Sequence, residues 1–471
     1  MKKMSSKGKP QKRMEVTGKI ISVIHRLIEF VVRGLLLLVA YLSGPAESQP
    51  PITDLTLLHS ATALATKIRN KQDCVGIKNM KQTAGLVSRK DIISEKDADV
   101  VKLMKKAGAI PLATTNVSEL AMWWESSNYL YGTSRNPYNS RHIVGGSSGG
   151  EGCLQGSAGS PCGLGSDIGG SIRMPCFFNG IFGHKPSKGI VSNEGQYPSA
   201  HNEAQNQLLG IGPMCRYAQD MTPILEVIAD GNAEKLNLRS KVDISKLKFY
   251  YMEDDGGQYL VSPVDREIKE SLRKVVHYLE KAHNIKATKL QIRRMKKSLA
   301  YWLANMACEE GHDFSYELSN RNGQINVWLE LVKWTLFMSN HTLIALLTAA
   351  FERFQIKIGT EEQTKLVQES RELYQEFRDF LGEDGIFLYP THPTAAPLHH
   401  EPFIKPFNFS YTAIINVLGL PATACPLGLN KQGLPIGLQI VGGLYQDRLT
   451  LAVAEELERG FGGWVPPAII A

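Results

Sequence analysis

Two short serine-containing stretches have the composition of a hydrolytic site. One is 166-SDIGGSIRMP-175, in which Ser171 follows two glycines, and the other is 145-GGSSGGEG-152, with Ser147 and Ser148. A serine after glycines can attack a carbonyl carbon while backbone N–H groups bind its oxygen, because residues without Cβ let other groups approach closely. A serine hydroxyl is a poor nucleophile until a base removes its proton, and neither stretch contains an evident base. The two stretches therefore predict serine chemistry with a base supplied from elsewhere.

Two general arrangements could supply that base. Residues 145–149 fit G-x-S-x-G, the nucleophile elbow of α/β-hydrolases, but only the short stretch 142–144 precedes them where the elbow needs a buried strand. A Ser-His-Asp triad would use His142 or His184, although neither lies beside a recognisable partner in the sequence. Both interpretations are therefore weakly supported by the residues.

The chain also resembles the amidase signature family, in particular its membrane-bound fatty-acid amide hydrolase branch, from about Thr53 to Trp464. The resemblance implies an α/β fold in which helices cover both faces of a large mixed β-sheet, and it implies hydrolysis of carboxylic amides. The matching stretches are 109-AIPLATTNVSEL-120, 124-WESSNYLYG-132, 141-RHIVGGSSGGEGC-153, 165-GSDIGGSIRMP-175, 178-FNGIFGHKPS-187, 388-LYPTHPTAAPLHH-400 and 417-VLGLPATACPLGL-429.

The resemblance also assigns roles to single residues. Ser171 would be the nucleophile that carries the acyl ester, and Ser147, on a cis peptide, would relay its proton to a lysine. The backbone amides of Ile168, Gly169, Gly170 and Ser171 would form the oxyanion hole. Asp167 and Arg173 would support the loop, and Ser148 has a lower claim to a catalytic role. No metal or other cofactor is implied, because the serine–lysine relay of the family uses none.

The lysine of that relay is missing from its expected place. In the family it ends a strand just before a stretch like 73-DCVGIKNMKQTAGL-86, whereas here 60-SATALATKIRNKQ-72 precedes and resembles the family's opening helix. The two pieces are joined directly at Gln72–Asp73, as a skipped exon or a misassembled gene would join them. Lys71 is a candidate substitute, but it follows helix-forming sequence. We therefore expect weak or no amidase activity, and the alternative is a catalytically dead amidase-fold protein that binds lipid amides or a partner.

The N-terminus divides into a basic tail, residues 1–18, and a hydrophobic segment, residues 19–46, before the amidase domain, residues 47–471. The uncharged part from Gly34 to Ser43 is shorter than the about 20 apolar residues that a bilayer requires. A longer segment from Ile20 includes three charged residues, Arg26, Glu29 and Arg33. A signal-peptide core, an interfacial amphipathic helix and an imperfect single-pass anchor all fit this pattern.

Of these, we favour a hydrophobic membrane helix that acts as a single N-terminal anchor. The basic residues precede it, so a spanning helix would keep the tail in the cytosol. The expected location is an endomembrane, at the endoplasmic reticulum or the lipid-droplet surface. The apolar stretch 325–351 could form an acyl-chain pocket or a membrane face, or it could simply cover the core.

Composition excludes several other classes. Much of the net charge of +7 comes from the basic tail, so we expect no nucleic-acid partner. The 7 cysteines are scattered without Cys-x-x-Cys spacing, which argues against a disulfide framework or a zinc site. The expected partners are a small amide, lipid in character, and a membrane, and a homodimer is left open.

Periodicity predicts the elements that must position the serines. Residues 97–108 predict a helix that Gly108 caps, followed by a strand over 109–114. Residues 265–282 predict an amphipathic helix with Ile268, Leu272, Val275 and Leu279 on one face. A buried strand follows at 384–390, and a hairpin pairs 422–429 with 434–441. A final helix is predicted to start at a capping Asp447 and to close at Gly460.

Overall fold

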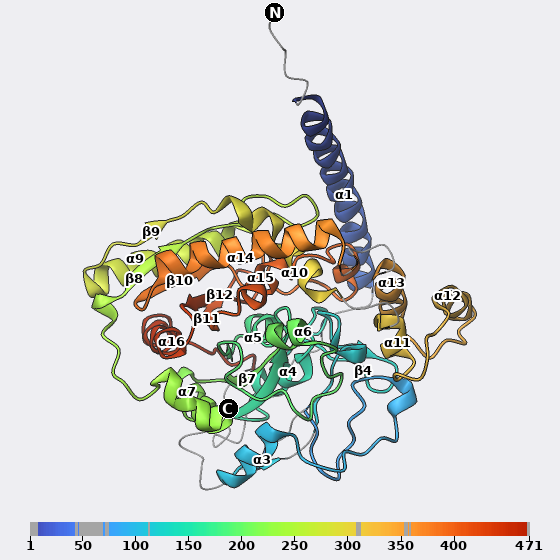
Figure 1. The fold of residues 1–471 in the computed structure, drawn as a ribbon, viewed down its shortest axis with the longest axis horizontal. Coiled ribbons are helices and arrows are strands. Elements are labelled where there is room, and N and C mark those ends of the chain that lie inside the picture. Colours follow the sequence, from blue (N-terminus) through green and yellow to red (C-terminus); the bar gives the residue numbers. More distant parts are fainter. Residues whose placement is uncertain are drawn as a thin grey trace, which may run out of the picture.

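An eight-stranded mixed sheet forms the centre of the domain (Figure 1). The computed structural model describes residues 8–42, 46, 69–70, 75–111, 114–307, 312–352, 357 and 359–468. The strand order is β5-β7-β6-β11-β12-β10-β8-β9, with β10–β8 and β8–β9 parallel and the other pairs antiparallel. The strands are β5 (Cys162–Asp167), β6 (Phe182–Lys185), β7 (Gly210–Cys215), β8 (Lys248–Tyr251), β9 (Thr288–Lys289), β10 (Gly385–Tyr389), β11 (Ala422–Leu429) and β12 (Pro435–Gly442).

Helices cover both faces of this sheet, as the resemblance implied. Side chains of β10 alternate between the two cores: Ile386 and Leu388 pack on one face, and Phe387 and Tyr389 on the other. The first core also holds residues of α3 (Asp99–Lys106), α7 (Met221–Ala229), α9 (Arg266–His283) and α16 (Asp447–Phe461). The second holds residues of α5 (Arg173–Asn179), α10 (Ser298–Met306), α14 (Glu361–Leu381) and α15 (Ser410–Leu418).

The regular C-terminal elements follow the sequence closely. The four apolar residues predicted for one face of α9 are buried, and β11 and β12 form the predicted antiparallel hairpin. The capping residues of α16 were predicted wrongly. Asp447 accepts hydrogen bonds from the backbone N and the Oγ of Ser187 instead, and Gly462, at φ 86°, closes the helix. Gly460 lies inside the helix, where a Cβ would come within 2.5 Å of the Tyr278 ring.

Strand β1 (Arg69–Asn70) pairs in parallel with β2 (Ile110–Pro111). Residues 60–72 resemble the family's opening helix, but the structure places Arg69 and Asn70 in a strand, because pairing with β2 satisfies backbone groups that local propensity would have placed in a helix. Lys71 and the junction at Gln72–Asp73 lie outside the described residues.

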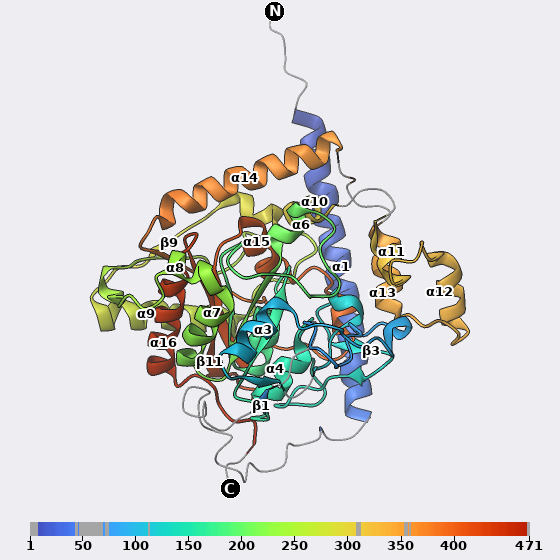
Figure 2. The ribbon, with the colours of Figure 1, turned by 60° about the horizontal axis from the view of Figure 1, so that its bottom comes forward.

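Helix α1 (Gly8–Leu42) begins inside the predicted tail and runs along one side of the domain, beyond which its N-terminal end extends (Figures 1 and 2). Among the described residues, no helix has both the length and the apolar character needed to cross a membrane. The predicted spanning anchor is thus not supported, and Arg26, Glu29 and Arg33 are the residues that interrupt its apolar run.

The apolar stretch 325–351 forms two short helices, α12 (Val327–Thr335) and α13 (Leu343–Glu352). Side chains of α13 both cover a small core and line a cavity, because residues three and four apart share a face of a helix. Ala345, Leu346, Ala349 and Ala350 are buried, whereas Ile344, Leu347, Thr348 and Phe351 face the cavity. Helix α12 instead exposes Trp328, Leu329 and Val332.

Candidate active site

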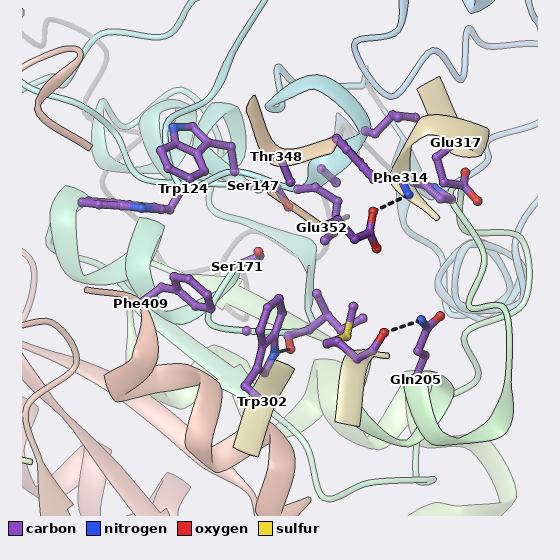
Figure 3. A pocket seen from close by; sticks show the side chains of 18 of the residues that line it. Trp124, Ser147, Ser171, Gln205, Trp302, Phe314, Glu317, Thr348, Glu352 and Phe409 are labelled. Atoms are coloured by element: carbon purple, nitrogen blue, oxygen red, sulfur yellow. Dashed lines mark hydrogen bonds between the residues drawn. The ribbon is translucent and has the colours of Figure 1, made fainter. Parts of the chain in front are cut away.

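One cavity of about 380 Å³ is lined by both Ser147 and Ser171 (Figure 3). Thr348 and Phe409, which lie far from the two serines in the sequence, line the same cavity. Trp124 and Phe409 lie on one side of the two serines, and Gln205 and Glu317 lie on the other. Most of the wall is apolar or aromatic, with contributions from Leu120, Met122, Trp123, Trp124, Met174, Trp302, Leu303, Phe314, Ile344, Leu347, Phe351, Phe403, Phe407 and Phe409. The cavity thus brings two hydroxyl groups to an apolar ligand space.

A buried ion pair holds the loop that carries Ser171. The loop links β5, which ends at Asp167, to α5, which begins at Arg173. The Asp167 carboxylate accepts from Gly170 N at 2.7 Å, from Ile172 N at 3.1 Å, and from Arg173 Nε and Nη2 at 3.0 and 2.9 Å. Burial alone would raise the pKa of Asp167, but the Arg173 charge and these hydrogen bonds outweigh it and hold the pKa below its usual value. The carboxylate therefore stays ionised and orders the loop.

Three residues from other parts of the chain orient the peptide groups of this loop. Trp302 Nε1 donates to Ile168 O at 2.9 Å, Thr412 Oγ1 donates to Gly169 O at 2.7 Å, and Asn416 Nδ2 donates to Asp167 O at 2.9 Å. In a planar trans peptide, a fixed carbonyl also fixes the N–H that follows it. Sequence motifs did not reveal these residues, because more than a hundred positions separate each of them from the loop in the chain.

One of the four amides that the resemblance assigns to an oxyanion hole has an acceptor within the protein. The N–H of Gly170 donates to Asp167 at 2.7 Å, so this amide already has an acceptor. The amides of Ile168, Gly169 and Ser171 remain as candidates for binding a substrate oxygen. Gly170 instead has a conformational role, because its φ of +125° and its contact with Thr412 exclude a side chain.

Ser147 stands at the entry to α4 (Gly149–Gly156), and the Gly146–Ser147 peptide bond is cis. The hydroxyl of Ser126 lies 2.9 Å from the carbonyl oxygens of both Gly145 and Ser147 and accepts from Gly149 N. Ser148 is turned toward β5, where its Oγ accepts from Ser166 N at 3.3 Å. Within the described part of the chain, neither Ser147 Oγ nor Ser171 Oγ has a hydrogen-bond partner, and Lys71 lies outside that part.

The histidine alternatives are not supported. His142 Nδ1 lies 2.6 Å from Ala396 O, and His184 is held between Thr423 Oγ1 and Asp447 Oδ1. Neither residue lines the cavity, and burial lowers the pKa of both imidazoles. The elbow interpretation also lacks its strand, because residues 142–143 form only isolated bridges.

The end of the cavity away from Trp124 is more polar. Glu317 on α11 (Phe314–Leu318) lies with its Oε1 2.7 Å from His201 Nε2 and accepts from Arg321 Nε at 2.9 Å. Gln205 on α6 (Glu203–Leu208) donates to Met306 O at 3.0 Å. The cavity thus has an apolar part beside the serines and a polar part at the opposite end.

Comparison with protein families matches residues 72–451 to the family described as Amidase. The chain is 49% identical over 397 residues to "Fatty-acid amide hydrolase 2" of Homo sapiens, covering 83% of this chain and 74% of that one. It is also 49% identical over 403 residues to "Fatty-acid amide hydrolase 2-A" of Danio rerio, covering 84% and 75%.

Two solved structures share the fold. A structure titled "Fatty acid amide hydrolase" superposes with a TM-score of 0.65 at 24% identity, covering 84% of this chain and 73% of that one. A 6-aminohexanoate cyclic dimer hydrolase complexed with substrate superposes with a TM-score of 0.67 at 20% identity, covering 83% and 84%. At this level of identity the structural likeness concerns the fold alone.

Proposed function

Because the chain belongs to the amidase family of hydrolases, we propose that it acts on carboxylic amides through Ser171, with long-chain fatty-acid amides as substrates. One observation carries the proposal: Ser147 and Ser171 line the same largely apolar cavity. Burial of each methylene of an acyl chain in such a cavity contributes about 0.8 kcal/mol, so long chains gain most. The names of the two fatty-acid amide hydrolase relatives support the same substrate class.

In the proposed reaction, Ser171 Oγ bonds to the amide carbon while its proton passes through Ser147 to a base. The carbonyl oxygen takes the negative charge, and the N–H groups of Ile168, Gly169 and Ser171 stabilise it. Collapse of this intermediate breaks the C–N bond, the nitrogen takes the proton, and the amine leaves. Water then hydrolyses the ester on Ser171 and restores its hydroxyl. The scheme uses no metal and no other cofactor.

The general base that the proposed reaction needs has not been located in this chain. We propose that a segment with the base lysine is missing at Gln72–Asp73, because the stretch from Asp73 resembles the sequence that follows the lysine strand in the family. A positioned general base contributes roughly 10²–10⁴-fold, so activity would be low. Lys71 remains the alternative base. The sequence argued against Lys71 because helix-forming residues precede it. In the structure the two residues directly before Lys71 form the strand β1 instead.

We also propose that α1 associates with a membrane surface, at the endoplasmic reticulum or a lipid droplet. The exposed apolar surface of α1 supports membrane association. It consists of Ile21, Val23, Ile24, Leu27, Ile28, Phe30, Val31, Leu35, Leu37, Leu38, Val39 and Leu42. An apolar helical surface with basic residues at one end suits a lipid–water interface. Flotation of the full chain with vesicles tests this, and a chain that stays entirely in the vesicle-free fraction would contradict it.

A fluorophosphonate probe tests the assignment of Ser171. The full chain should be labelled, and Ser171→Ala should abolish labelling. Ser147→Ala should slow labelling by roughly 10²-fold or more if Lys71 acts as the base, and should have little further effect if the base is missing. Ser148→Ala is the matched control and should retain labelling, since its hydroxyl faces Ser166. Labelling that survives Ser171→Ala and disappears with Ser147→Ala or Ser148→Ala would reverse the assignment.

One observation favours a second candidate, a catalytically dead amidase-fold protein that binds lipid amides. No base contacts Ser147 Oγ within the described residues. Saturable binding of a long-chain amide without release of amine would support this candidate. Multiple turnovers by a homogeneous preparation, abolished by Ser171→Ala, would exclude it.

A further inference from the structure

The ionisable residues inside the apolar helix α1 lie on one stripe. His25, Glu29 and Arg33 are spaced four residues apart, which places their side chains on one face of the helix. Ser22, buried to 8% exposure, continues the same stripe toward the N-terminus. Arg26 lies off the stripe and is exposed. This pattern indicates a helix that packs against protein along one polar line.

All three residues contact the catalytic domain. Glu29 Oε1 lies 3.0 Å from Lys405 Nζ and accepts from Ser262 Oγ at 3.1 Å. Arg33 Nε lies 3.5 Å from Glu401 Oε1, and His25 Nε2 lies 2.8 Å from the carbonyl oxygen of Ile404. The contacts come from residues far apart in the sequence, so they are tertiary.

Two of the domain residues are buried charges. Lys405 and Glu401 are 2% and 1% exposed at their side chains and pair with each other at 2.7 Å. Glu29 and Arg33 add one charge of each sign, so the four residues form a neutral ion-pair quartet. An exposed ion pair contributes little, but Lys405 and Glu401 are buried, so removing Glu29 or Arg33 takes one of two charged partners from a desolvated group, which is costly.

The segment that carries Glu401 and Lys405 also forms a wall of the cavity. Phe403, at the end of the 3-10 helix η8 (Glu401–Phe403), lines the cavity together with Pro406 and Phe407. The Phe407 ring lies 5.9 Å from the ring of Phe351, a cavity residue on α13 that is 46% exposed. Both ribbon views show α1 running beside α13 (Figures 1 and 2). Residues 401–407 thus stand between α1 and the ligand space.

We propose that α1 is a structural part of the substrate pocket, docked on residues 401–407 by the quartet Glu29, Arg33, Glu401 and Lys405. Glu29 and Arg33 are positioning residues: they hold the wall formed by Phe403, Pro406 and Phe407 against α13, where a long acyl chain enters. The ligand class rests on the proposed function, whereas the docking of α1 does not.

Hydrogen exchange tests the docking independently of any catalysis. In the full chain, Glu29→Gln with Arg33→Gln should speed exchange in residues 20–35 and 401–407 by roughly tenfold or more, because a buried pair loses its partners. Glu29→Lys, which faces Lys405 with a like charge, should do so even as a single substitution. Arg26→Gln removes an exposed charge of the same helix and should leave exchange unchanged. Unaltered exchange in both Glu29 variants would overturn the proposal.

Ligand binding tests the consequence for the pocket. In a Ser171→Ala background, which prevents turnover, the Glu29→Gln/Arg33→Gln variant should bind a sixteen-carbon primary amide several-fold more weakly. A four-carbon amide should bind as before, because it does not reach the 401–407 wall. Equal weakening of both ligands would show general unfolding and overturn the positioning role. If neither amide binds to any form while exchange still responds, the proposed substrate class fails and the docking of α1 stands.

Discussion

Gly170 has the strictest steric requirement of the residues around Ser171. A Cβ at this position would lie 2.0 Å from Thr412 Oγ1, and the φ of +125° disfavours any L-residue. The same Thr412 hydroxyl holds the Gly169 carbonyl, so displacing it would also release the Gly169–Gly170 peptide of the loop that carries Ser171. Replacement of Gly170 should therefore affect both the stability of the fold and ligand binding.

Gly170→Ala should lower the free energy of unfolding by about 2–4 kcal/mol, from steric overlap and backbone strain together. Probe labelling at Ser171 should fall with it. Gly189→Ala is the matched control, because Gly189 also has a positive φ, +72°, but a Cβ there meets nothing within 4 Å. Urea unfolding of both variants checks this, and equal losses would refute the role assigned to the Thr412 contact.

Glu151 on α4 is a fully buried acid that takes no part in the proposed reaction. Its Oε1 accepts from Gln155 Nε2 at 2.7 Å, and burial raises its pKa to about 8. In the unfolded chain this carboxyl ionises near the ordinary glutamate pKa of 4.5. Between these values the folded state binds more protons than the unfolded state, so stability should fall as pH rises through that window.

Glu151→Gln keeps the shape of the side chain and removes its titration. We expect the variant to be more stable than the parent at pH 8 by about 2–4 kcal/mol and to show no corresponding gain at pH 5. Glu253→Gln is the control: its pKa lies at about 2, held down by Arg273 and Lys289, so its contribution does not change over this range. Parallel pH profiles for the parent and Glu151→Gln would contradict the raised pKa.

At the scale of elements, α13 packs one face into a core and lines the cavity with the other. One face packs alanines and Leu346 into a small core, while Thr348 and its neighbours line the cavity. The adjacent α12 has a similar apolar composition but exposes Val332 at 56% and does not line the cavity. The two helices therefore offer a matched pair of positions for testing chain-length selection.

Thr348→Trp should fill part of the cavity and weaken binding of a sixteen-carbon amide by roughly tenfold or more, since each excluded methylene forfeits about 0.8 kcal/mol. A four-carbon amide should bind as to the parent. Val332→Trp places the same side chain on the exposed face of α12 and should leave both affinities unchanged. Titrations in the Ser171→Ala background provide the measurement, and equal affinities of the Thr348 variant and the parent would count against an acyl-chain pocket.

At the scale of the whole molecule, the proposed activity requires a base, and the residues that follow β1 are where we propose that it is missing or replaced by Lys71. If a base lysine is missing at the junction, inserting the family's strand with its lysine before Asp73 should raise amide hydrolysis by roughly 10²–10⁴-fold. The insertion with alanine in place of that lysine is the control and should give no gain. Activity already high in the 471-residue chain and abolished by Lys71→Ala would instead identify Lys71 as the base.

The fold is predictable where local pattern and tertiary packing agree. The continuous apolar run of β10 indicates a strand buried on both faces, and the spacing of Leu272, Val275 and Leu279 indicates one face of α9. Prediction failed where a distant partner decides the outcome. Asp447 bonds to Ser187 instead of capping its helix, and Arg69 pairs with β2.

By itself, the sequence determined the paired-serine loops, the family resemblance and the main sheet elements, because these depend on residue types at short spacing. Only the tertiary structure decided that the Gly170 amide donates to Asp167 and that Trp302 and Thr412 orient the loop. It also decided that Glu29 and Arg33 of α1 contact Lys405 and Glu401, in the segment that forms one wall of the pocket. The physical reason is that hydrogen bonds and ion pairs depend on distance in space, and chain folding brings together groups that no local pattern connects.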